Sequence, residues 1–307
     1  QGVFNRNEEE DKIICSFHRQ KQKTLKRNSR EYQRLSDHVG KYPVVMISPA
    51  DSSLIIEGSE ERRKFMNKII SQYSPGYLES VLNYNKALQQ RNRLLKDFNL
   101  KSDYDPETLS VWNAQLAKYG NHVFRERMLL IGELGPVFQQ YYSMISGEKE
   151  KVSLAYKSHL SKGDFFDALK HAVKKDLSLE YTTIGIHKDE LSFEMDGYPV
   201  RSLGSQGQQK SFLVALKLAK FEYIKSKAGF SPILLLDDIF DKFDADRVGR
   251  IIRLVGNQRF GQIFITDTHQ DRLEVILNEL DAEYKLFRIG EKGIEEIVQN
   301  GNRQESI

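Results

Sequence analysis

The sequence predicts an α/β fold with an all-helical lobe inserted into it, and three patterns support this prediction. Strand-like runs occur in residues 1–58 and again in 170–307. In the second region they alternate with amphipathic helices, which is typical of a sheet covered by helices on both faces. Between the two regions, in 59–169, apolar residues recur every three or four positions, as they do along one helix face. We therefore expect a discontinuous α/β lobe and one helical lobe.

The first region is expected to begin with a β-hairpin. Residues 13–17 alternate apolar and less apolar side chains, and a short polar link joins them to 23–27. A short helix over 32–39 should end at Gly40. A proline then precedes 44–48, a run of β-forming residues that predicts a buried strand.

The middle region is expected to contain three helices. Ser59 is a good N-cap for the first, and an apolar seam over 77–95 marks the second. The third should begin at Asp105, which precedes a proline. The second and third helices should pack antiparallel because only a modest loop joins them. Arg91 and Glu126 interrupt their seams, so we expect a compact lobe rather than a long coiled coil.

The last region should alternate strands with helices. Such an order builds a sheet in which the carboxyl ends of parallel strands meet at one edge. The strands are expected at 181–186, 191–195, 233–236 and 262–266, and the helices at 205–227, 246–255 and 271–280.

Composition narrows the possible classes of protein. Lys and Arg (46) exceed Asp and Glu (43) by only three, so any basic surface must come from local clustering. The single cysteine, Cys15, cannot form an internal disulfide, and no Cys/His array suits zinc. No apolar run approaches the length of a membrane span, and the first residues do not resemble a signal peptide. We expect a cytoplasmic protein without membrane association.

The sharpest motif is a pair of acids that directly follows the expected strand at 233–236. Asp237 and Asp238 would lie at the carboxyl edge of the sheet, where α/β folds bind ligands. The first carboxylate suits Mg²⁺, and the second suits an attacking water. By itself the pair is equally well explained as a cap at the end of a strand.

A glycine-led helix start precedes these acids. The small residues Gly204, Ser205 and Gly207 leave backbone N–H groups accessible at a helix N-terminus, which favours a phosphate. The alternative is an ordinary serine N-cap at Ser205. Downstream, further acids lie at 241–244, and the strand expected at 262–266 leads into 267–269.

The order of these pieces resembles the second half of an ABC-type ATPase: signature loop, Walker B strand, D-loop and switch strand. Over nearly the whole chain the segments are similar to the RecF family. The resemblance implies the mixed sheet of a P-loop NTPase head carrying a helical lobe. The segments are Gly204-Ser-Gln-Gly-Gln-Gln-Lys210, Gly185-Ile-His-Lys-Asp-Glu-Leu191, Val44-Val-Met-Ile-Ser-Pro-Ala-Asp51, Glu61-Arg-Arg-Lys-Phe-Met66 and Asn83-Tyr-Asn-Lys-Ala-Leu-Gln-Gln-Arg-Asn-Arg-Leu-Leu95.

The resemblance also implies a role for each motif residue, with ATP and Mg²⁺ as cofactors. For His269, the alternative is an ordinary surface histidine. The implied residues are Asp237 for Mg²⁺, Asp238 for the attacking water, Ser205, Gln206, Gly207 and Gln208 for ATP held by the other subunit, Asp241 and Asp244 for the D-loop, and Asp267 and His269 for the switch region.

One departure from the family's pattern concerns the phosphate-binding loop. No G-x-x-x-x-G-K-[ST] occurs, and Gly2 is the only glycine before Gly40. In the RecF family this loop precedes the residues seen here, so we expect the sequence to be a fragment that starts after it. Without the loop's backbone and lysine, the 307 residues alone should bind ATP weakly and hydrolyse it negligibly.

A cluster of cations in the first hairpin is a candidate DNA surface, opposed only by Glu31. Its phosphate contacts would be independent of sequence and sensitive to salt. The alternative is the solvated face of a hairpin. A second group of cations at 62–64 is as readily explained by ion pairs within the chain, with the acids at 57, 60 and 61. The candidate DNA-binding residues are Lys21, Lys23, Lys26, Arg27, Arg30 and Arg34.

The RecF resemblance implies an ATPase of DNA replication, recombinational repair and the SOS response. It would bind duplex, gapped or junction DNA as an ATP-closed homodimer, release it on hydrolysis, and act with RecO and RecR. The alternatives are a transporter's nucleotide-binding subunit, which would need membrane partners, and an SMC-like head, which would need far longer coiled arms. A non-catalytic binding module is a further alternative.

Overall fold

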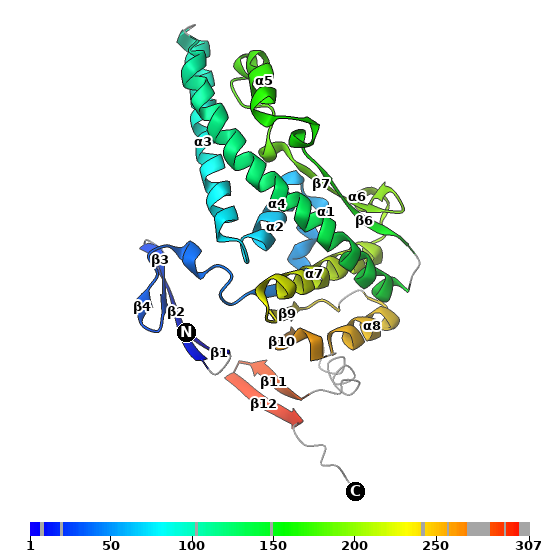
Figure 1. Ribbon diagram of the computed structural model, residues 1–307. Helices are drawn as coiled ribbons and strands as arrows, with labels where there is room; N and C mark the ends of the chain where they lie inside the picture. Colours follow the sequence, from blue (N-terminus) through cyan, green and yellow to red (C-terminus); the bar gives the residue numbers. More distant parts are fainter. Residues whose placement is uncertain are drawn as a thin grey trace.

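The fold was analysed in a computed structural model of the chain (Figure 1). The structure describes residues 1–6, 9–18, 21–101, 104–147, 150–240, 243–256, 258–268, 283–291 and 293–300. Within these ranges, no helix combines the length and the apolar character needed to cross a bilayer.

A three-stranded parallel sheet forms the α/β layer, in the order β10-β9-β5. Its strands are β5 (Val44–Ile47), β9 (Ile233–Asp237) and β10 (Ile263–Thr266). One face packs against the long helix α7 (Gln206–Ala228). On the other face, Val44 is 39% and Met46 44% exposed, so β5 is buried on one face only and not on both as expected. The strands expected at 233–236 and 262–266 and the helix expected at 205–227 are confirmed as β9, β10 and α7.

The N-terminal residues form a separate antiparallel sheet. It contains β1 (Gly2–Arg6), β2 (Glu9–His18), β3 (Lys21–Arg27) and β4 (Arg30–Glu31), and the expected hairpin is its central pair. The helix expected over 32–39 is shorter, because only a 3₁₀ turn forms (η1, Leu35–His38), and no side chain caps its first N–H groups.

Helices dominate the middle of the chain, where α3 (Pro75–Lys101) and α4 (Pro106–Ser146) lie antiparallel. Asp105 caps α4 as expected, since its carboxylate accepts from the N–H groups of Glu107 and Thr108. The expected cap at Ser59 is wrong. Gly58 occupies the N-cap, and the Ser59 hydroxyl instead donates to Glu190. The remaining short helical elements here are η2 (Pro49–Ser52), α1 (Ser53–Ile56) and α2 (Ser59–Ile70).

A second antiparallel sheet contains β6 (Val152–Lys157), β7 (Glu190–Met195) and β8 (Tyr198–Pro199). β6 lies within the stretch expected to be helical, and it pairs with β7 across a long sequence separation. The strand expected at 181–186 is wrong, because this segment is a loop leading into a 3₁₀ turn. The elements around the sheet are η3 (His159–Lys162), α5 (Phe165–Leu179), η4 (Ile186–Lys188) and α6 (Val200–Leu203).

The C-terminal part contains α8 (Ala245–Val255), η5 (Gln258–Phe260) and a hairpin of β11 (Tyr284–Gly290) and β12 (Gly293–Asn300). The helix expected at 271–280 lies outside the described residues.

One hydrophobic core joins the long helices to the parallel sheet and to the antiparallel sheet of β6, β7 and β8. Phe212 of α7 packs 4.6 Å from Phe138 of α4 and 5.2 Å from Phe193 of β7, measured between ring centroids. These aromatic contacts fix the position of α7, whose N-terminus carries the signature residues. The division into two lobes remains a prediction.

Candidate functional site

The two acids lie at the carboxyl edge of the parallel sheet. The run of apolar residues in β9 places Asp237 at the last position of this central strand, beside Thr266 of β10. The Thr266 hydroxyl donates to Asp237 Oδ1 at 2.6 Å. The N–H of Asp238 donates to the Thr266 carbonyl at 3.1 Å. Asp238 has a φ of 48°, a left-handed conformation that ends strand β9 at Asp237.

This edge supplies oxygen ligands suited to Mg²⁺. Asp237 and Asp238 are only half-buried, so their carboxylates remain accessible. Among the described residues, no group of three potential ligand side chains surrounds a single point. A pair of carboxylates fits the usual magnesium site of nucleotide-binding proteins, in which phosphate oxygens and water complete the coordination.

The signature residues form a well-capped helix N-terminus. The Ser205 hydroxyl accepts from the N–H of Gln208 at 3.2 Å, and Gln208 Oε1 accepts from the N–H of Ser205 at 2.8 Å. This reciprocal capping leaves the N–H groups of Gln206 and Gly207 at the helix end, where the helix dipole favours an anion. The serine N-cap and the phosphate-binding end are therefore compatible features of the same residues.

Two residues that sequence reasoning missed hold this helix end in place. Gln208 Nε2 donates to Glu150 at 2.8 Å, and Glu150 also accepts from the hydroxyl of Tyr142 in α4. On the other side, a Cβ atom on Gly207 would lie 2.7 Å from Nη1 of Arg247 in α8. Both neighbours are distant in sequence, and no local pattern marks them.

Asp244 connects this contact to the expected D-loop. It caps α8 by accepting from the N–H of Arg247 at 2.8 Å, and its carboxylate lies 3.3 Å from the Arg247 guanidinium. The segment leading into α8 therefore lies against the first turn of α7. Asp241 and His269 fall outside the described residues, while Asp267 directly follows β10.

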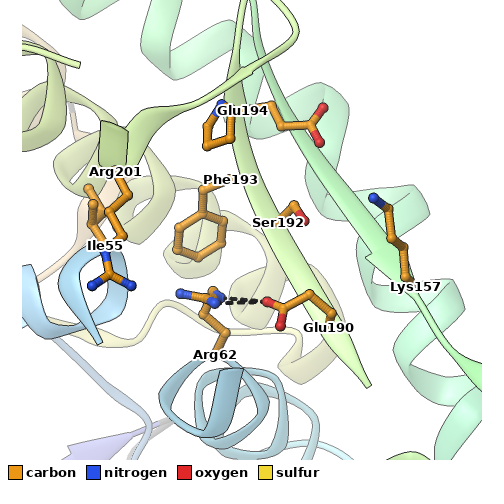
Figure 2. A pocket seen from close by; sticks show the side chains of 9 residues that line it. Ile55, Arg62, Lys157, Glu190, Ser192, Phe193, Glu194 and Arg201 are labelled. Atoms are coloured by element: carbon orange, nitrogen blue, oxygen red, sulfur yellow. Dashed lines mark hydrogen bonds and ion pairs between the residues drawn. The ribbon is translucent and has the colours of Figure 1, made fainter. Parts of the chain in front are cut away.

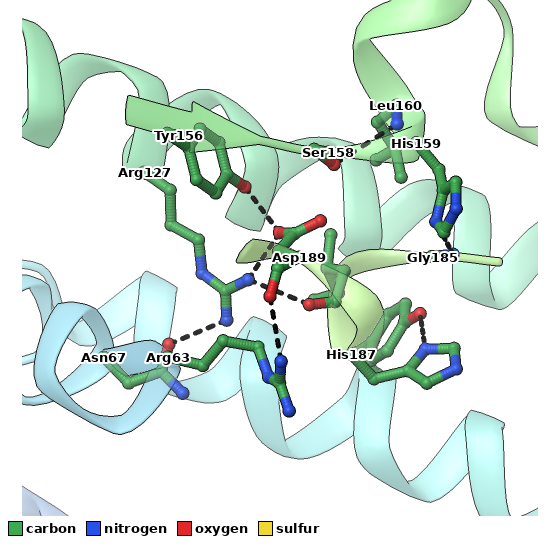
Figure 3. Close-up of polar contacts among 12 residues, drawn as sticks. Arg63, Asn67, Arg127, Tyr156, Ser158, His159, Leu160, Gly185, His187 and Asp189 are labelled. Atoms are coloured by element: carbon green, nitrogen blue, oxygen red, sulfur yellow. Dashed lines mark hydrogen bonds and ion pairs between the residues drawn. The ribbon is translucent and has the colours of Figure 1, made fainter. Parts of the chain in front are cut away.

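A polar cluster joins several of the motif segments (Figure 3). Arg127 of α4 donates to Asp189 Oδ2 at 2.6 Å, and Tyr156 of β6 donates to the same oxygen at 2.5 Å. Arg127 also donates to Asn67 in α2, and Arg63 donates to the Asp189 carbonyl. Segments 61–66 and 185–191 therefore meet at one buried ion pair.

His187 belongs to the same region and is neutral. Its Nε2–H donates to the Thr182 carbonyl at 3.0 Å, so its Nδ1 accepts from the Tyr84 hydroxyl at 2.8 Å. Burial lowers the pKa of His187 to about 4. The residue is a structural link between α3 and the segment before β7.

Arg91, which interrupts the apolar seam of α3, forms a second buried pair. Its Nη1 lies 2.7 Å from Asp176 of α5, and both side chains are fully buried. Asn113 of α4 accepts from Arg91 Nε at 2.7 Å. Arg91 thus connects α3 to α4 and α5 through buried polar contacts.

The cations of the N-terminal hairpin differ in their surroundings. Lys23, Arg30 and Arg34 are exposed. Lys26 lies 3.8 Å from Glu31. The side chain of Lys21 is outside the described part of the structure.

Arg27 is engaged within the fold. It donates to both carboxylate oxygens of Asp11 at 2.7 Å, and Asn28 and Tyr42 donate to the same carboxylate. These hydrogen bonds, led by that of Arg27, hold the pKa of Asp11 well below its usual range. Burial and the bond to Asp11 raise the pKa of Tyr42 to about 12.

The cations at 62–64 make contacts within the chain, but only Lys64 has the ion-pair partners that the alternative interpretation named. Arg62 pairs with Glu190 at 2.8 Å, and Lys64 pairs with Glu60 and Glu61. Arg62 and Arg63 therefore attach α2 to the segment at 189–190, whereas the pairs of Lys64 lie within α2.

The parallel sheet, the acids at its edge, the capped α7 and the paired long helices define the head of an ABC-type ATPase. A solved structure described as the recombination mediator protein RecF with a bound ATP analogue has a TM-score of 0.80 at 24% identity, covering 95% of this chain and 78% of its own. An Smc head domain with an extended coiled coil from Pyrococcus furiosus gives a TM-score of 0.53 at 15% identity, covering 95% and 72%.

Curated relatives show the family. The DNA replication and repair protein RecF of Flavobacterium johnsoniae is 48% identical over 93% of this chain and 80% of its own length. The RecF of Phocaeicola vulgatus is 47% identical over 94% and 78%. The chain belongs to the RecF family. No protein-family profile matches it.

Proposed function

We propose that this protein binds DNA as a dimer closed by ATP and releases the DNA when the ATP is hydrolysed. The observation that carries the proposal is the hydrogen-bonded edge formed by Asp237, Asp238 and Thr266, which faces the same end of the layer as the capped start of α7. The names of the relatives supply the context of DNA replication and repair.

The lengths of α7 and β9 favour a nucleotide shared between two copies. The helix has 23 residues and the strand five, and a short link at 229–232 makes them run in opposite directions. They are therefore about 34 Å and about 17 Å long. The start of α7 projects beyond the acids by roughly 15–20 Å, too far for both to contact one phosphate group.

In the proposed mechanism Asp237, oriented by the Thr266 hydroxyl, would hold Mg²⁺, which would offset the charge of the phosphates. Asp238 orients the attacking water and accepts its proton. A second copy supplies the α7 terminus, whose N–H groups bind the γ-phosphate. The proposed contacts from that copy are Ser205, Gln206, Gly207 and Gln208, with Asp241 and Asp244 at the dimer contact and Asp267 and His269 near the switch.

We assign DNA contact to the exposed hairpin cations Lys23, Arg30 and Arg34, together with Lys21 and Lys26. Arg27 is left out because Asp11 occupies its guanidinium. Backbone phosphates are the natural partners of such a cluster. The solved RecF structure is described as a mediator in the RecFOR pathway, which supports RecO and RecR as partner proteins.

The alternative of an SMC-like head is less well supported. Its coiled arms would have to be far longer than α3 and α4, which have 27 and 41 residues. A transporter subunit would be revealed by a requirement for a membrane partner.

The test is Asp238→Asn in the full-length gene product. It should abolish ATP turnover while leaving ATP binding, so that an ATP-bound dimer accumulates on a sizing column with light scattering. Asp246→Asn, an exposed acid in the first turn of α8, is the matched control and should behave as the wild type. Unchanged turnover and dimerisation in Asp238→Asn would refute the proposed role of Asp238.

A further inference from the structure

A cavity lies between the α1–α2 segment and the β6–β8 sheet, separate from the acidic edge (Figure 2). Its volume is about 310 Å³. The apolar lining consists of Ile55, Phe193 and Pro199, and the ring of Phe193 forms its centre in this view. In this view Arg201 of α6 lies on one side of that ring, and Lys157 of β6 lies on the other side, beyond strand β7.

One charged pair in the cavity wall is already satisfied. Arg62 donates to Glu190 through Nε at 3.1 Å and Nη2 at 2.8 Å, and its Nη1 donates to the carbonyls of Leu54 and Glu57. Glu190 also accepts from the Ser59 hydroxyl. This pair is part of the wall and is not available to a ligand.

Two other cations in the cavity are available. Within the described residues, Lys157 and Arg201 have neither an ion pair nor a hydrogen bond from the side chain. Both are exposed at the cavity mouth. The remaining acid, Glu194, accepts a long hydrogen bond of 3.4 Å from Ser153.

Exposed apolar side chains stand next to the lining residues. Ile56 is 55% exposed and follows Ile55, Tyr198 is 60% exposed and precedes Pro199, and Leu203 is 67% exposed in the same short helix as Arg201. Helix α6 contacts both α1 and β8, so the three elements that carry these side chains adjoin one another. Apolar side chains grouped around a cavity mark a protein-binding surface more often than a nucleic-acid one.

We propose that this cavity is a docking site for an acidic segment of a partner protein. An apolar side chain of the segment enters the cavity, whose floor includes the 6% exposed Phe193, and carboxylates before and after it pair with Arg201 and Lys157. Two cations on opposite sides of a ring suit two separated carboxylates better than one phosphate. Glu190 and Glu194 in the walls also disfavour a polyanion such as DNA.

The experiment selects peptides from a random nonapeptide phage library on the 307-residue chain. A counter-selection uses the Lys157→Glu/Arg201→Glu double variant. The enriched peptides should carry Asp or Glu on both sides of an aromatic or aliphatic residue. Fluorescence anisotropy with labelled peptides then measures their affinity for each protein.

The double variant should weaken binding at least tenfold, and each alanine substitution should weaken it roughly two- to fivefold, as expected for exposed ion pairs. Replacing the central apolar residue of the peptide by glycine should also cost at least tenfold. Lys162→Glu, an exposed cation outside the cavity, should change nothing. Lys23→Glu/Arg30→Glu should also leave binding intact, which excludes capture by the basic hairpin.

Three results would overturn the proposal. The first is enrichment of peptides with no acidic preference, or no enrichment above the counter-selection. The second is an equal loss of binding in Lys162→Glu. The third is displacement of the peptide by millimolar inorganic phosphate or by an oligonucleotide, which would make the cavity a simple anion site. Circular dichroism and thermal melting of each variant verify that it folds.

Discussion

Thr266 in β10 donates a hydrogen bond of 2.6 Å to Oδ1 of Asp237, which ends the neighbouring strand β9. The bond uses one of the two oxygens of this carboxylate. The hydroxyl therefore fixes the orientation of a carboxylate that we assign to Mg²⁺. This relationship makes Thr266 a positioning residue, which was not among the candidates from sequence.

Thr266→Val keeps the shape of the side chain but removes the hydroxyl. Loss of one hydrogen bond should cost about 1 kcal/mol, or roughly a fivefold change. The concentration of Mg²⁺ that gives half-maximal ATP turnover in the full-length gene product should rise by that factor. Thr266→Ser keeps the donor and should restore the wild-type value. Equal Mg²⁺ dependence of all three proteins would remove Thr266 from the site.

The buried pair of Arg127 and Asp189 predicts a large effect on stability. Arg127→Met leaves the Asp189 carboxylate buried with only neutral donors, and breaking such a pair costs about 3–5 kcal/mol. Urea unfolding of the 307-residue chain should show this loss. Lys64→Met breaks a pair whose lysine is 50% exposed, and it should change stability by less than about 1 kcal/mol. Comparable losses in the two variants would contradict the assignment.

Lys220 of α7 predicts a dependence of stability on pH. It is 8% exposed, and burial, with Lys217 nearby, lowers its pKa to about 7. The unfolded chain holds this proton up to about pH 10, so between pH 10 and 7 it binds more protons than the folded chain. Stability is therefore lost as pH falls through this window.

Lys220→Met should abolish this loss. The variant should be more stable than the wild type by a few kcal/mol at pH 7, and the difference should shrink towards pH 10. Lys217→Met is the matched comparison, because Lys217 donates to Asp51 at 2.5 Å and to the Met46 carbonyl at 3.0 Å. That variant should be less stable than the wild type. Thermal melting of both variants at several pH values tests these two predictions. If Lys220→Met is no more stable than the wild type at pH 7, burial of Lys220 does not destabilise the fold.

The hairpin cations predict the salt dependence of DNA binding. Each phosphate contact contributes about 0.9 to the slope of log K against log salt concentration on duplex DNA. Lys23→Ala/Arg30→Ala/Arg34→Ala should therefore lower the slope by about 2–3 in the full-length gene product with ATP. Three exposed lysines elsewhere, changed as Lys162→Ala/Lys174→Ala/Lys175→Ala, form the control and should leave the slope unchanged.

Arg27→Ala should act differently from its neighbours. Asp11 would lose its ion pair, so the N-terminal sheet should become less protected in hydrogen exchange. A change in the salt slope without a change in protection would return Arg27 to the DNA surface.

Local signals allowed much of the fold to be predicted. The apolar run before Asp237, the proline after Asp105 and the Ser205 capping sequence each act within a few residues, and each formed as expected. The same locality explains the errors. Residues 181–186 have the composition of a strand but do not pair with another strand. Conversely, β6 forms because it pairs with β7, which is distant in sequence.

The candidate site shows the same limit. The acids and the helix start are contiguous motifs, whereas Glu150 reaches Gln208 and Arg247 reaches Gly207 only through the packing of α4, α7 and α8. The ion pairs of Arg127 with Asp189 and of Arg91 with Asp176 likewise join residues 62 and 85 positions apart. Sequence patterns mark Arg91 as an exception to its seam, but they give no partner.

Helix α4 is continuous over 41 residues, about 61 Å along its axis, and contains Pro136. One end lies beside the signature helix, where Tyr142 touches Glu150 and Glu150 touches Gln208. The opposite end pairs with α3 at the far tip of the molecule (Figure 1). Over this length, a tilt of about 5° at the end beside α7 corresponds to a displacement of about 5 Å at the distant tip.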